Sequence, residues 1–118
     1  MTYTADDVLK VLDQIVLDFG PDYQVRNCFY ADRDTGQPVC IVGQVLYRLA
    51  LPFPEYDDIW SSVQDSHDGY DFDDDANMIL GHAQTVQDNR SSLVRERTWG
   101  TAVAFARNVY ENEGVYCG

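Results

Sequence analysis

Basic residues are scarce in this sequence. Its 118 residues include 8 Lys and Arg against 20 Asp and Glu, which gives a formal net charge of −12 at pH 7. The shortage is also local, because the stretch between Arg48 and Arg90 contains ten acidic residues and no basic one. A chain this acidic repels the phosphates of nucleic acids, so the composition excludes a conventional nucleic-acid-binding protein.

Long apolar runs and paired cysteines are also missing. No apolar run approaches the ~18 residues of a membrane span, and the first residues, MTYTADDVLK, do not have the layout of a signal peptide. The three cysteines, Cys28, Cys40 and Cys117, form neither a disulfide framework nor a CxxC pair. We therefore expect a cytoplasmic protein without membrane contact, in which Cys28 and Cys40 are small buried residues.

The sequence has none of the common catalytic motifs. It contains no P-loop, GxGxxG, GxSxG or HExxH pattern. Its two histidines, His67 and His82, lie apart from the cysteines and do not form a zinc pattern. A calcium loop centred on Gly69 would place Gln64 and Ser66 where carboxylate ligands belong. The sequence therefore assigns no catalytic residue, no metal site and no cofactor.

Hydrophobic periodicity is the clearest signal that is present. Apolar residues recur at helical spacing in five segments: 5–19, 40–50, 55–64, 76–88 and 99–113. Three of these segments are preceded by residues suited to cap helices: Thr4, one of Asp73, Asp74 or Asp75, and Thr98. Helical spacing with caps at these positions predicts a chain that is mostly α-helical.

One segment is typical of β-structure. Residues 24–31 suit a strand, residues 32–36 have turn chemistry, and residues 37–39 could form a short second strand. Gly43 lies inside the helix predicted over 40–50, where glycine costs about 1 kcal/mol against alanine, so we expect another backbone to approach it closely. The predicted fold class is α+β, mostly α: one compact domain over residues 1–118, with four to five helices and a small β-hairpin.

Three short motifs carry a resemblance. They are C-x-V-G-x-x-L over residues 40–46, A-Q-x-x-Q-D over 83–88 and W-G-x-A-x-x-x-A over 99–106. In this order they resemble small uncharacterised proteins of actinobacteria and their bacteriophages. The resemblance implies a phage-derived protein, and it carries over no catalytic residue because the group has no established activity.

Packing explains only part of these motifs. Small residues such as Gly43 and Ala102 suit helix contacts, and Trp99 fills space between helices. Gln84, Gln87 and Asp88 are not explained by packing. They could either cap a neighbouring backbone or contact a partner.

The leading functional hypothesis is a small acidic interaction protein. It would bind a bacterial host protein with a basic face, in host takeover or against a defence component, through aromatic side chains within an acidic rim. The residues expected on this surface are Phe53, Tyr56, Asp57, Asp58, Trp60, Asp71, Asp73 and Asp74. The same carboxylates could also serve solubility alone, or imitate the phosphates of DNA.

The alternative is a protein that binds, sequesters or hydrolyses a small, nucleotide-like molecule. Its pocket would be lined by Cys40, His82, Gln84, Gln87 and Trp99. A homodimer is a further option, because the basic cluster at residues 90–97 could pair with acidic residues of a second copy or of the same chain.

Overall fold

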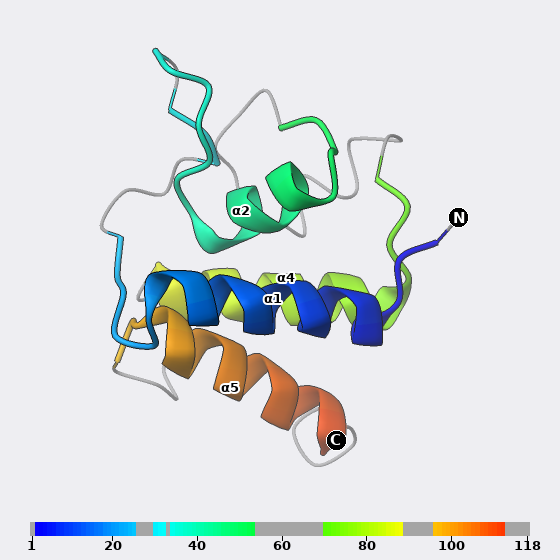
Figure 1. The fold of residues 1–118 in the computed structure, drawn as a ribbon. Helices are drawn as coiled ribbons and strands as arrows, with labels where there is room; N and C mark the ends of the chain where they lie inside the picture. The colour runs from blue at the N-terminus through cyan, green and yellow to red at the C-terminus, as the bar shows by residue number, and fades with distance from the viewer. Residues whose placement is uncertain (1, 26–29, 33, 54–69, 89–95, 113–118) are drawn as a thin grey trace.

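Four α-helices make up most of the part of the chain that the computed structural model describes, residues 2–25, 30–32, 34–53, 70–88 and 96–112 (Figure 1). They are α1 (Ala5–Phe19), α2 (Ile41–Arg48), α4 (Asp74–Gln87) and α5 (Trp99–Glu111). The prediction of a mostly helical chain is therefore confirmed. The predicted helix over 55–64, together with Cys28, His67 and Cys117, lies outside the described residues.

Three of these helices are capped at their starts by side chains at the predicted positions. Thr4 and Asp7 form a reciprocal capping box at the start of α1, with bonds of 3.3 and 3.0 Å. The Asp73 carboxylate accepts from the Ala76 amide at 2.8 Å and caps α4. Thr98 caps α5 in the same way. Each cap satisfies amide donors that the helix itself leaves without a partner.

The end of α2 differs from the prediction. The helix finishes at Arg48 rather than at residue 50, because Ala50 adopts a φ of 58° in the left-handed region. The Leu51 amide then donates to the Leu46 carbonyl at 2.8 Å. This pattern closes a helix in the manner usually provided by glycine.

The predicted hairpin is not shown. Among the described residues this segment has one isolated antiparallel bridge, between Ala31 and Pro38. The turn itself is present, since the Asp32 carboxylate accepts from the Asp34 amide at 2.8 Å. The Asp32 amide donates to the Gln37 carbonyl at 2.8 Å and the Val39 amide to the Tyr30 carbonyl at 3.1 Å, so this bridge needs no donor from Pro38. The helix α2 begins only three residues after Pro38, which leaves no length for a longer second strand. Residues 26–29 of the predicted first strand lie outside the described part of the chain.

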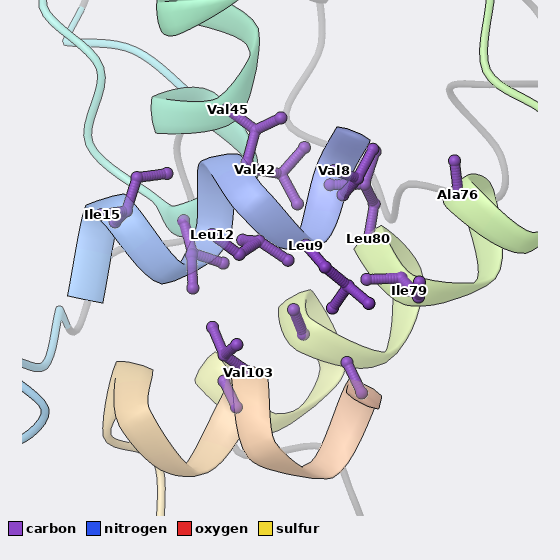
Figure 2. Close-up of a cluster of buried hydrophobic side chains, with 14 of the residues drawn as sticks. Val8, Leu9, Leu12, Ile15, Val42, Val45, Ala76, Ile79, Leu80 and Val103 are labelled. Carbon is purple, nitrogen blue, oxygen red and sulfur yellow. The ribbon is translucent and has the colours of Figure 1, made fainter. Parts of the chain in front are cut away.

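The core forms around α1, which packs against the other three helices. In Figure 1, α2 lies on one side of α1 and α5 on the other, with α4 behind. Figure 2 shows the apolar side chains that fill the space between them. Among the fully buried ones are Leu12, Ile15, Val42, Ile79 and Leu80.

Two glycines allow backbones to approach closely. A side chain at Gly43 would collide with the backbone carbonyl of Tyr30, which confirms the close approach predicted for this position. The amide of Gly100, at the start of α5, donates to the Pro21 carbonyl at 3.0 Å. A Cβ atom at Gly100 would lie 2.7 Å from that oxygen, so this contact holds the start of α5 against the end of α1.

Candidate functional site

Four of the eight residues expected on a partner-binding surface can be located. Asp71 and Asp74 are exposed, whereas Asp73 is half-buried as the cap of α4 and Phe53 packs against the core. The other four, Tyr56, Asp57, Asp58 and Trp60, lie outside the described residues.

The structure adds acidic residues that the sequence analysis did not group with this surface. Tyr3 and Phe72 form a parallel bridge, in which the Tyr3 amide donates to the Asp71 carbonyl at 2.8 Å and the Asp73 amide to the Tyr3 carbonyl at 3.0 Å. The bridge places the starts of α1 and α4 side by side (Figure 1). We call the resulting cluster of carboxylates the acidic end; it consists of Asp6, Asp7, Asp71, Asp73, Asp74 and Asp75.

Helix geometry stabilises the negative charge at this place. The first turns of α1 and α4 present amide hydrogens and the positive ends of two helix dipoles, which favour nearby carboxylates. Hydrogen bonds from the backbone and side chain of Thr4 lower the pKa of Asp7 below its ordinary value. The hydrogen bonds to Thr4 therefore favour the ionised form of Asp7 at the start of α1.

The residues expected around a ligand pocket occupy the interior. Gln87 and Trp99 are 0% exposed, and Gln84 is 5% exposed. The Gln87 side-chain oxygen accepts from the Ile41 amide at 2.6 Å and from the Trp99 indole at 3.0 Å. Gln87 therefore caps a neighbouring backbone, which was one of the two roles left open by the sequence.

Cys40 is buried as predicted, and it also has a role that the sequence did not reveal. Its sulfur accepts from the Gly43 amide at 3.2 Å and caps α2. Burial raises the pKa of the Cys40 thiol to about 12, so the thiol stays protonated and is a poor nucleophile at neutral pH. No signal in the sequence distinguishes a capping cysteine from a packing cysteine.

The remaining two residues of this set, Gln84 and His82, each contact an aromatic side chain. The Gln84 amide donates to the Tyr30 hydroxyl at 2.7 Å. His82 is half-buried and its ring meets Phe105 edge-on, with centroids 5.7 Å apart. Burial lowers the pKa of His82 below its ordinary value.

The structure also forms an open groove that the sequence did not predict. It lies between α1 and α5, toward the end of α1, and has a volume of about 600 Å³. We call it the α1–α5 groove. Apolar atoms dominate its lining, which includes Val16, Leu17, Pro21, Val103 and Ala104.

Charged side chains border the α1–α5 groove. Among the lining residues that the structure describes, Asp13, Asp22 and Glu96 supply carboxylates and Arg107 supplies the one guanidinium. Arg107 is held by Asp13 in an ion pair of 2.7 Å. Asp22 and Glu96 therefore leave the other part of the border negative.

The part of the chain that the structure describes contains no group of three His, Cys, Asp or Glu side chains placed to hold a metal ion. Within the same residues, no helix has both the length and the apolar character needed to cross a membrane.

The fold and these surfaces define a compact, mostly helical protein with carboxylates gathered near both ends of α1. No protein-family model, curated protein or solved structure matches the chain.

Proposed function

We propose that the chain is a small acidic cytoplasmic interaction protein that binds a partner protein with a basic face. The resemblance to proteins of actinobacteria and their phages makes a bacterial host protein the partner class, bound in host takeover or to block a defence component. The acidic end is the proposed contact surface, because two helix starts and the Tyr3–Phe72 bridge bring its carboxylates together.

The pairing of basic residues supports this proposal. Arg48 pairs with Asp18 at 2.8 Å, and Arg107 pairs with Asp13 at 2.7 Å. Both arginines therefore neutralise carboxylates in the middle and at the end of α1 rather than at its start. Arg97 donates to the carbonyls of Gln87 and Val25 at 3.2 and 3.1 Å. These contacts direct three of the four described Lys and Arg side chains away from the acidic end. The fourth, Lys10, contributes to the lowered pKa of Asp7 through its charge.

Such a surface has a predictable effect on binding. Clustered carboxylates accelerate the association of a basic partner and orient it, and salt weakens the effect. Arg97 belongs to the basic cluster that could have bridged two copies of the chain, but it is engaged within its own chain. The other two arginines of that cluster, Arg90 and Arg95, lie outside the described residues. We therefore favour a basic partner over a homodimer.

The experiment that tests the proposal compares capture by two charge-reversed variants. The full chain is immobilised, exposed to a bacterial lysate at low salt, and its binders are identified by mass spectrometry. The test variant is Asp6→Lys/Asp74→Lys, which reverses two exposed carboxylates of the acidic end and leaves the caps Asp7 and Asp73 intact.

The control variant changes the net charge by the same amount elsewhere. It is Asp34→Lys/Glu111→Lys, at two exposed positions outside the acidic end. We expect one dominant partner that the wild type and the control capture and that the test variant loses. Equal capture by all three proteins, with circular dichroism showing each one folded, would contradict the proposal.

A further inference from the structure

We propose that the α1–α5 groove is the docking site for a partner segment in which a large apolar side chain is flanked by Lys or Arg. The inference rests on the proposed function, since it gives a basic partner protein a second contact on this chain. It concerns a site distinct from the acidic end, and the two sites can be tested separately.

The apolar part of the groove has both an exposed wall and free space. Leu17 is 76% exposed, which is the largest exposure among the large hydrophobic residues that the structure describes. Opposite it, Gly100 and Ala104 on α5 have little or no side chain, so the groove between the helices stays open. Gly100 must remain small because of its contact with Pro21, so this opening is built into the packing of α5 on α1. An apolar side chain of a partner would cover Leu17 there.

The direction in which α5 leaves α1 gives the groove its shape. The two helices meet where the Gly100 amide bonds the Pro21 carbonyl, and α5 then runs away from α1 at an angle (Figure 1). The Asp13–Arg107 ion pair bridges the two helices further along. A segment lying in the groove is thereby bounded by a backbone contact at one end and an ion pair at the other.

The charges at the two ends of the groove favour a basic segment. Asp22 follows Pro21 directly, and Glu96 accepts a hydrogen bond at 2.9 Å from the hydroxyl of Thr101, the residue after Gly100. Asp13 at the other end is already paired with Arg107. A Lys or Arg beside the apolar anchor would meet the first pair of carboxylates. Charged groups at the rim set specificity and association rate, while the central apolar contact supplies most of the affinity.

The same charges disfavour two other occupants. A second copy of the chain would bring a net charge of −12 toward an acidic border. The phosphates of a nucleotide would be repelled by Asp22 and Glu96. Charge complementarity therefore favours a basic protein segment.

Selection from a library of random displayed peptides tests the inference. Peptides are selected on the immobilised full chain, and an enriched peptide is synthesised and titrated against variants in solution. We expect enriched sequences to combine Lys or Arg with a large apolar residue. Leu17→Ser and Ala104→Trp should each weaken binding by about tenfold or more, which corresponds to about 1.4 kcal/mol.

Two further variants make the result specific to the groove. Tyr47→Ser removes another exposed large side chain, 54% exposed and outside the groove lining, and should leave the affinity unchanged. Asp22→Lys should lower the association rate and its dependence on salt. Selection of acidic or charge-free peptides, or equal losses in Leu17→Ser and Tyr47→Ser, would overturn the inference. Because Leu17 is exposed, its replacement leaves the core intact even if Ala104→Trp fails to fold.

The outcome is separable from that of the proposed function. If the acidic-end variant loses its partner while no peptide depends on Leu17, the proposed function stands and the groove inference fails. If Leu17-dependent basic peptides are selected while the lysate supplies no partner, the groove binds such segments and the proposed function fails.

Discussion

At the scale of single residues, Gln87 connects three separate segments through one buried amide. Its oxygen accepts from the first amide of α2 and from the indole of Trp99 at the start of α5, and its own position is the last residue of α4. Both donors are buried. A buried donor that loses its acceptor costs about 1–3 kcal/mol, so this one side chain stabilises the arrangement of the helices.

Replacing Gln87 by leucine should therefore be strongly destabilising. The variant Gln87→Leu retains the bulk of the side chain but leaves the Ile41 amide and the Trp99 indole without an acceptor. We expect the free energy of unfolding, measured in urea, to fall by about 2–4 kcal/mol. Gln14→Leu, on the exposed face of α1, is the control and should change it by less than about 0.5 kcal/mol. Equal effects of the two substitutions would contradict this role.

His82 should make stability depend on pH. Burial lowers its pKa in the folded protein below the ordinary 6.5, so the unfolded chain binds a proton more readily than the folded one. The stabilisation that comes from the neutral form of His82 is complete above about pH 6.5 and is lost as the pH falls below this value. Melting temperatures between about pH 7.5 and pH 5.5 should fall less in His82→Gln than in the wild type. An NMR titration giving His82 a pKa of 6.5 or higher would contradict the prediction.

At the scale of elements, the sequence best predicts those features that depend on residues close together in the chain. Thr4, Asp73 and Thr98 could be predicted as caps, because a capping side chain bonds an amide within the following turn. The extent of the hairpin could not, since strand-forming residues alone do not supply a ladder, and α2 begins at Ile41, soon after the Ala31–Pro38 bridge. The capping role of Cys40 does not follow from the sequence either, because a cysteine at this position fits a packing role equally well.

Two glycines in helices should respond to alanine in opposite directions. Gly43→Ala would place a Cβ atom against the Tyr30 backbone and should lower the free energy of unfolding, despite the better helix propensity of alanine. At Gly81, within α4, an added Cβ atom would meet no other atom within 4 Å, so Gly81→Ala should raise the free energy of unfolding by about 0.5–1 kcal/mol. Denaturant unfolding of both variants measures the difference, and a stabilising Gly43→Ala would show that the close approach is absent.

The end of α2 offers a stabilising substitution. Ala50 has a φ of 58°, which costs a residue with a Cβ atom roughly 1 kcal/mol and costs glycine almost nothing. Ala50→Gly should therefore raise the melting temperature by a few degrees, the shift typical of about 1 kcal/mol in a domain of this size. Ala104→Gly, at an exposed alanine inside α5 where φ is negative, is the control and should lower it. A lower melting temperature for Ala50→Gly would contradict the left-handed ending.

At the scale of the whole molecule, the candidate sites depend on contacts between distant parts of the sequence. The acidic end requires Tyr3 to pair with Phe72, and Thr2 also donates to the Asp71 carboxylate at 3.1 Å. The α1–α5 groove requires the angle at which two helices separate beyond the Pro21–Gly100 contact. The sequence alone indicated three acidic residues of the acidic end, Asp71, Asp73 and Asp74. Neither the contribution of α1 nor the α1–α5 groove follows from local patterns.

The decisive measurement for the acidic end as a binding surface is the salt dependence of partner capture by the wild-type chain. The full chain is immobilised, and binders from a bacterial lysate are quantified by mass spectrometry at low, physiological and high salt. We expect one stoichiometric, basic partner whose capture decreases steadily as salt rises, because exposed carboxylates carry the attraction. Capture that is unaffected by salt, or the absence of any stoichiometric partner at low salt, would contradict it.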